Sequence, residues 1–193
     1  TLWFAVEAYS STTVTAVTIE TGTAPPPPGY ACADAIDMDT GTSPWTGSFG
    51  DYGNSWTYGS GCGYASGPEA WFTATLASGQ VLEIEETSAT NATVQQVTAC
   101  GSTTCEANAS SPEKLIYYND TAGPVDLVYA VEAYSSTETG AIAIAWSEGP
   151  PPAGFTCGGA IDASSLASPW TGSLGDYANL WTGGAGCGTA SGP

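Results

Sequence analysis

The chain has 193 residues, of which 42% are hydrophobic, so it can bury a core. Nineteen acidic residues face a single base, Lys114, and the formal net charge is −18. This balance argues against nucleic acid as a partner, because Lys and Arg are needed to neutralise phosphates, and no apolar run is long enough to insert into a membrane. The chain contains no histidine, which removes the serine and cysteine triads that depend on an imidazole base. We therefore expect a protein that is not an enzyme.

An internal repeat organises the sequence. Residues 2–12 return as residues 127–137, and residues 25–68 return as residues 150–193 with 28 of 44 positions identical. Both matches have an offset of 125 residues, which predicts tandem units of that length. We expect the C-terminal strands of a preceding repeat at 1–24, one complete β-sandwich repeat at 25–149, and the N-terminal part of a following repeat at 150–193. Either the chain is a window from a longer tandem array, which we favour, or it is a processed subunit whose ends are completed by neighbouring copies.

A proline run opens each predicted unit, at residues 25–28 and again at residues 150–152. Consecutive prolines hold an extended polyproline II path. The runs therefore predict semi-rigid spacers between repeats.

Six cysteines in a short chain favour a disulfide framework in an oxidising, extracellular compartment. The full unit carries Cys32, Cys62, Cys100 and Cys105, whereas the following head carries only Cys157 and Cys187, the counterparts of the first two. Because the head keeps just this pair, we predict the bridges Cys32–Cys62 and Cys157–Cys187. The remaining bridge, Cys100–Cys105, would then close a tight loop.

Recurring aromatic and acidic residues follow the first cysteine. Trp45, Tyr52 and Trp56 return as Trp170, Tyr177 and Trp181, and they either stack on sugar rings or, as we favour, pack in the core. Asp37, Asp51 and Glu132 return as Asp162, Asp176 and Glu7. Calcium is one reading of these carboxylates, but an aspartate in a turn more often binds its own backbone. We expect no cofactor, with calcium as the alternative.

Alternating apolar residues predict the strands. The pattern has a period of two at residues 70–76, 82–85 and 127–133, and Ile142, Ile144 and Trp146 continue it near the end of the unit. Glycine, serine, asparagine and proline punctuate these runs. About eight short strands in 125 residues predict an all-β sandwich.

Three N-x-Ser/Thr sequons lie between the predicted strands, at Asn91, Asn108 and Asn119. In a secreted protein such sites are typical glycan acceptors on surface loops. We predict that all three lie on exposed turns and that at least one carries a sugar.

The complete unit also resembles a family. A cysteine followed by Ala-Ile, then GCG, GPEAWFTATLASGQVLEI, CGSTTC and DLVYAVEAYSSTETGAIAIAW, is similar to bacterial secreted repeats of the pre-peptidase C-terminal and CUB-like kind. The resemblance implies a jelly-roll-like sandwich of eight or nine strands in which Gly140 makes the final hairpin turn. It also implies a role as an appendage of secreted enzymes, a surface module or a component of extracellular fibres.

Repetition, cysteines and the missing catalytic residues together favour a structural subunit of an extracellular fibre, stalk or cell-surface array, with a glycan coat. Its partners would be other copies of itself or neighbouring repeats of the same chain, in a linear assembly. The alternative is a carbohydrate-binding or adhesive module of a secreted protein.

Overall fold

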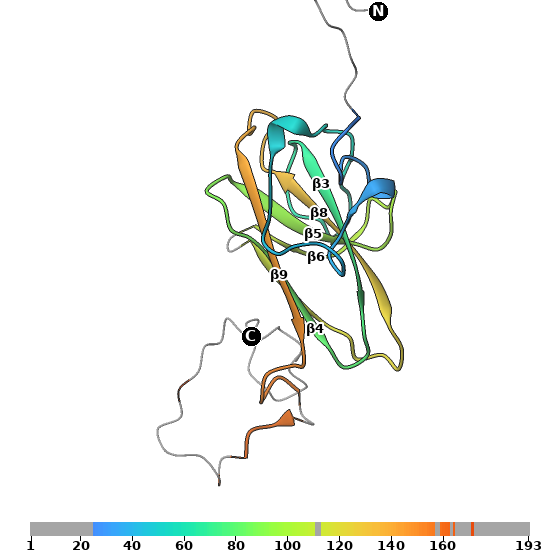
Figure 1. The fold of residues 1–193 in the computed structure, drawn as a ribbon, viewed down its shortest axis with the longest axis vertical. Helices are drawn as coiled ribbons and strands as arrows, with labels where there is room; N and C mark the ends of the chain where they lie inside the picture. Colours follow the sequence, from blue (N-terminus) through green and yellow to red (C-terminus); the bar gives the residue numbers. More distant parts are fainter. Residues whose placement is uncertain (1–24, 111–112, 157–158, 163, 165–170, 172–193) are drawn as a thin grey trace, which may run out of the picture.

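The computed structural model describes residues 25–110, 113–156, 159–162, 164 and 171 (Figure 1). These residues form an all-β fold with two short 3-10 helices, η1 (Cys32–Asp34) and η2 (Phe49–Asp51). The strands described are β1 (Ile36–Asp37), β2 (Trp45–Ser48), β3 (Glu69–Leu76), β4 (Val81–Glu86), β5 (Ala92–Val97), β6 (Cys105–Ala109), β7 (Lys114–Tyr118), β8 (Val125–Ala133) and β9 (Ala141–Gly149). The predicted all-β class is confirmed.

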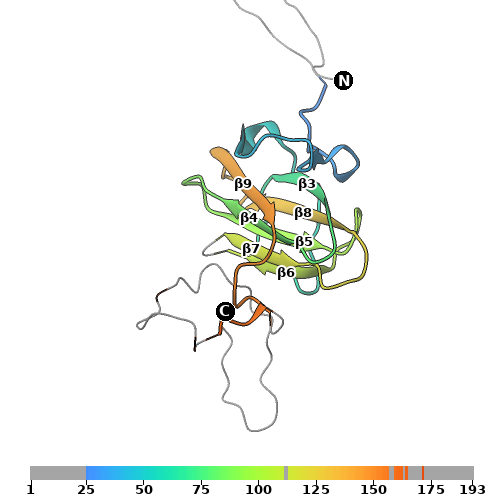
Figure 2. The same ribbon diagram turned by 60° about the horizontal axis from the view of Figure 1, so that its bottom comes forward.

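The strands form two sheets that pack face to face (Figure 2). One has the order β1-β3-β8-β5-β6 and the other the order β2-β9-β4-β7. Every pairing is antiparallel except that of β1 with β3. The alternating residues predicted for four strands point into the space between the sheets, where Phe72, Ile84, Tyr129 and Ile144 are buried.

The last two strands do not form the hairpin that the family resemblance implies. β8 pairs with β3 and β5, whereas β9 pairs with β2 and β4, so the chain crosses from one sheet to the other between them. Gly140 lies in this crossing, and a Cβ there would approach Thr90 Oγ1 within 2.5 Å. The glycine is thus required by close packing against Thr90.

The outer face of the five-stranded sheet is covered as well. Trp71 and Ala130 alternate with core residues on β3 and β8, so they point outward, yet both are buried in a second apolar cluster. Trp56, from the segment between η2 and β3, packs on Trp71 with ring centroids 5.4 Å apart. Its indole N–H donates a hydrogen bond to Ser102 O at 2.8 Å.

Two disulfides fasten the residues that cover this face to the sheet, one from Cys32 of η1 and one from Cys62 of the segment between η2 and β3. Both differ from the predicted pairs. Cys32 bonds to Cys100 and Cys62 bonds to Cys105, so the predicted Cys32–Cys62 and Cys100–Cys105 bridges are wrong. Cys100 lies in the turn between β5 and β6, which backbone hydrogen bonds close by themselves (Thr98 N–H to Thr104 O, 3.2 Å). Cys100 in the turn and Cys105 after it can therefore bond to two different covering residues.

Cys157 and Cys187 lie outside the described residues. Their predicted bridge rested on a pairing of Cys32 with Cys62 that the structure does not have, so that argument is removed. The two disulfides that are described indicate an extracellular or periplasmic location.

Within the described ranges, none of the helices has the length and apolar character needed to span a membrane.

Candidate functional site: the junction after strand β9

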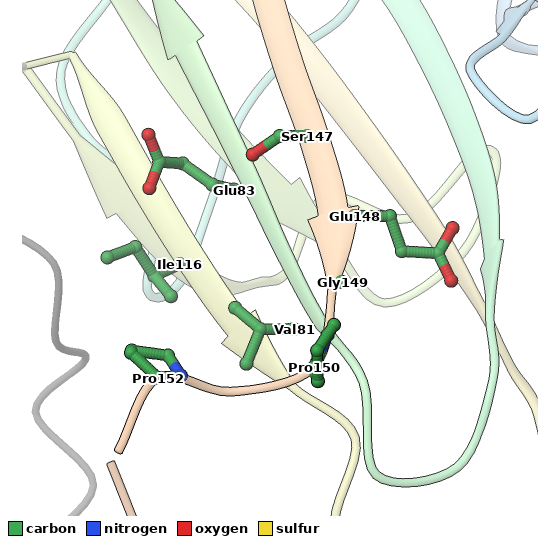
Figure 3. A pocket seen from close by; sticks show the side chains of 8 residues that line it. All are labelled: Val81, Glu83, Ile116, Ser147, Glu148, Gly149, Pro150 and Pro152. Atoms are coloured by element: carbon green, nitrogen blue, oxygen red, sulfur yellow. The ribbon is translucent and has the colours of Figure 1, made fainter. Parts of the chain in front are cut away.

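The chain leaves the sandwich at the end of β9 through a groove on the four-stranded sheet. The groove holds about 240 Å³ and is lined by Val81, Glu83, Ile116, Ser147, Glu148, Gly149, Pro150 and Pro152 (Figure 3). Leu82 and Ile84 of β4 point into the core, so Val81 and Glu83 point to the opposite, outer face. The proline run is therefore one wall of a groove on this face.

An aromatic contact lies beside the groove. Tyr118, the last residue of β7, is opposite Val81 in the β4–β7 register and so belongs to the same outer face. The ring of Phe155 packs edge-on against Tyr118, with centroids 5.7 Å apart and an interplanar angle of 65°. Aromatic pairs favour this arrangement because the positive ring edge meets the negative face. We call Tyr118, Phe155 and the groove the junction.

The turn that carries Phe155 also occurs at the start of the sandwich. In the first copy, Tyr30 N–H donates to Pro27 O at 3.2 Å, Gly29 N–H donates to Asp34 O at 2.7 Å, and Gly29 has a φ of 79°. In the second copy, Phe155 N–H donates to Pro152 O at 3.0 Å, Gly154 N–H donates to Gly159 O at 2.7 Å, and Gly154 has a φ of 89°. All of these positions differ by 125 residues, and the positive φ explains why a glycine directly precedes the aromatic residue in both copies.

The three predicted glycan acceptors lie in different environments. Asn91 and Asn108 are exposed, but Asn108 lies within β6 and not on the turn that was predicted. Asn119 is fully buried, so the prediction that it lies on an exposed turn is wrong. Its amide nitrogen donates to Leu76 O (2.9 Å) and Gly123 O (2.8 Å), which uses both of its N–H bonds. Asn119 therefore anchors the loop between β7 and β8, a role that a sequon does not reveal.

The proposed sugar-stacking aromatics are packing residues. Tyr52 is buried and donates its hydroxyl hydrogen to Pro28 O at 3.0 Å. Trp45 packs on Phe72 of the main core with ring centroids 5.4 Å apart, and Trp56 packs on Trp71. Trp170, Tyr177 and Trp181 lie outside the described residues.

The carboxylates considered for calcium do not meet. Asp37 accepts hydrogen bonds from Asp39 N–H (3.0 Å) and the Thr40 hydroxyl (2.7 Å), the turn geometry that the sequence favoured. Asp51 is exposed, whereas Glu132 is buried on β8. No group of three or more metal-ligating side chains occurs in the described part of the chain.

Of the repeat counterparts of these carboxylates, only Asp162 lies in the described part of the chain. Asp162 accepts hydrogen bonds from the backbone and hydroxyl of Ser164, and these bonds lower the pKa of Asp162. Glu7 and Asp176 lie outside the described residues.

Sequence reasoning missed a buried pair of carboxyl groups, Glu69 and Glu132. They are directly opposite each other on β3 and β8, beneath the segment that covers the five-stranded sheet. Glu69 accepts hydrogen bonds from the hydroxyl of Ser55 (2.7 Å) and the backbone of Trp56 (3.0 Å), so it holds the cover in place. Burial raises the pKa of Glu69, and these hydrogen bonds oppose the shift.

The carboxyl group of Glu132 accepts fewer hydrogen bonds than that of Glu69. Its Oε2 accepts one hydrogen bond from Gln95 Nε2 at 2.8 Å, whereas Oε1 has no partner among the described residues. Burial, followed by the charge of Glu69, raises the pKa of Glu132 to about 8. The pair is therefore best occupied by one proton near neutral pH. A glutamate on each of two strands gave no sequence signal, because outward-facing strand positions are often charged.

A second missed feature is an exposed group of tyrosines. Tyr64 packs edge-on between Tyr58 and Tyr134, with ring centroids 6.1 Å and 5.6 Å away. Tyr64 and Tyr134 are among the exposed large side chains of the described residues. Tyr58 and Tyr64 lie in the segment between η2 and β3, whereas Tyr134 follows β8, so no local motif marks the group.

No protein-family model and no curated protein matches this chain. Among solved structures, the chain is similar to PliG of Aeromonas hydrophila, a periplasmic inhibitor of g-type lysozyme. The identity is 9%, the TM-score is 0.36, and the match covers 59% of this chain and 93% of PliG. A similarity of this size carries no argument about function.

Proposed function

We propose that the chain is a structural subunit of an extracellular fibre, stalk or cell-surface array built from tandem β-sandwich repeats with a jelly-roll-like fold. The supporting observation is the position of the two ends. The described chain enters the sandwich at one end of its long axis, and β9 leaves it at the other, in both views (Figures 1 and 2). Units connected in this way extend along a line.

The recurring turn supports the same proposal. The backbone geometry that follows the first proline run is repeated 125 residues later, which is the offset of the sequence repeat. A following unit would therefore begin its fold as this one does. Exposed Asn91 and Asn108 are the acceptors that remain for a glycan coat.

The disulfides suit a load-bearing module. Cys32 lies near the N-terminal end of the unit, and its bond to Cys100 joins this end covalently to the second half of the sandwich. Tension applied along an array would pass through that bond and bypass the residues between the two cysteines.

Sedimentation velocity of the native material tests this proposal. We expect elongated particles heavier than the 19.4 kDa of one chain. A compact monomer at micromolar concentration would contradict the proposed assembly.

The tyrosine group favours a second candidate, a carbohydrate-binding or adhesive module. Exposed aromatic rings can stack on the apolar faces of sugars, and Tyr58, Tyr64 and Tyr134 lie together. Trp45, Tyr52 and Trp56 instead pack in the apolar clusters. Glycan-array binding that is lost in Tyr64→Ala but kept in Tyr30→Ala, an exposed tyrosine outside this group, would support this candidate. Equal binding by both variants would argue against it.

A further inference from the structure

We infer that consecutive repeats are joined by a fixed aromatic contact, in which the ring that follows each proline run docks on the preceding repeat at the position of Tyr118. In this chain Phe155 is that ring and Tyr118 is the ring on which it docks. The inference rests on the proposed tandem arrangement and names the partner of the junction, which is a second repeat of the same kind.

The two copies of the turn differ in one informative way. Tyr30 and Phe155 occupy the same position in the same turn, yet Tyr30 is 38% exposed and Phe155 only 7%. Phe155 has Tyr118 of the preceding sandwich beside it. The docking partner of Tyr30 would belong to a repeat before residue 25. The exposed ring of Tyr30 therefore marks the face where that repeat docks.

Tyr30 is also held by its own repeat. Tyr30 stacks on Tyr52 with centroids 6.4 Å apart and an interplanar angle of 21°. Tyr52 is in turn fixed by its hydrogen bond to Pro28 O, at the end of the proline run. A ring held by its own unit on one side and by the preceding unit on the other restricts the angle between the two.

The linker adds to this restriction. Pro150 and Pro152 line the groove of the preceding sandwich (Figure 3). Proline fixes φ, so the short linker has few conformations even before the ring docks. The joint is therefore stiff, and the array should behave as a rod.

The chemistry of the contact suits two units of like charge. The chain has one base and nineteen acids, so neighbouring repeats repel each other and cannot exchange many ion pairs. Lys114 already pairs with Glu83 of its own sheet at 2.8 Å. An apolar ring contact needs no opposite charge, which is why we assign the joint to aromatic residues.

Fluorine NMR of the complete 193-residue chain tests the contact. The chain has four phenylalanines, so labelling with fluorophenylalanine gives four signals, and Phe155→Leu identifies the one from Phe155. We expect this signal to have a small H2O/D2O solvent shift, as a buried ring does. In Tyr118→Ala the signal should move toward the value of free fluorophenylalanine, and its solvent shift should at least double.

Internal controls separate loss of the contact from unfolding. Phe49 and Phe72 are fully buried, so their signals must stay unchanged in Tyr118→Ala. If they move, Tyr118→Thr replaces that variant, because a β-branched residue favours the strand but removes the ring. Tyr64→Ala removes an exposed tyrosine elsewhere and should leave the Phe155 signal in place.

The proposed joint would be overturned if the Phe155 signal in the unmodified chain had the chemical shift of free fluorophenylalanine. It would also be overturned if the signal did not change in either Tyr118 variant. This result is independent of assembly. Native arrays in which Phe155 is mobile would refute the joint and leave the proposed function standing, whereas a docked Phe155 in a strictly monomeric protein would refute the array and leave the contact.

Discussion

The disulfide pairing sets how far the chain can be extended by force. When an unfolded unit is pulled from its ends, the taut path follows the shortest covalent route. The Cys32–Cys100 bond bypasses a sequence separation of 68 residues, and the Cys62–Cys105 bond bypasses 43. The first route is shorter, so it alone carries the load. The second bond should stabilise the fold without affecting the extended length.

Paired substitutions give distinct lengths. An extended residue spans about 3.5 Å, so removing both bonds should lengthen the unfolded chain by roughly 240 Å. Cys32→Ser with Cys100→Ser leaves the second bond as the shortest route, and the gain should be about 90 Å. Cys62→Ser with Cys105→Ser should change the extended length by about 0 Å.

Single-molecule force spectroscopy of the complete chain, held at its two ends, measures these contour-length increments. The Cys62→Ser/Cys105→Ser variant is decisive. Had Cys62 been bonded to Cys32 and Cys105 to Cys100, this variant would open both loops and gain about 120 Å. A gain of that size would refute the connectivity and the load path through Cys32.

Two further predictions concern stability. Because the pKa of Glu132 is raised to about 8 from an ordinary 4.5, its contribution to stability is fully present below about pH 4.5 and is lost as pH rises through 8. Glu132→Gln should therefore stabilise the protein by about 2–4 kcal/mol at pH 9 and change little at pH 4, by urea unfolding at each pH; a constant difference would contradict the raised pKa. Asn119→Ala should cost about 2–3 kcal/mol, because it leaves Leu76 O without the Asn119 donor and Gly123 O with only the Thr121 hydroxyl. Asn108→Ala should cost less than 1 kcal/mol, and equal losses in thermal unfolding would contradict the anchoring role of Asn119.

The strands that the sequence predicted are those with one face in the main core. β3, β8 and β9 alternate cleanly, since their inward residues are apolar. β5 was missed, because the two successive glutamines in its sequence ATVQQV break the alternation of apolar and polar residues. Both glutamines are buried in the structure, since Gln95 binds Glu132 beneath the covering segment and Gln96 binds Glu106. Local sequence does not record a cover supplied from another part of the chain.

The same cover explains the errors at the cysteines and the contacts of Trp56. Cys62 and Trp56 belong to a segment without regular structure, and only its docking on β3, β6 and β8 determines what they contact. The repeat showed that Cys32 and Cys62 recur together, but recurrence does not require that they bond to each other. The junction was partly predictable, because the proline run and the ring after it recur. Tyr118, the ring on which Phe155 docks, could be found only from the fold.

The axial repeat of the native material is the most direct test of the proposed tandem array. β9 has nine residues, or about 30 Å of strand, and the proline linker adds about 10 Å. Averaged electron micrographs should therefore show straight filaments or stalks with a spacing of about 40–50 Å along their length. Isolated globular particles, or threads without a regular spacing, would contradict the array.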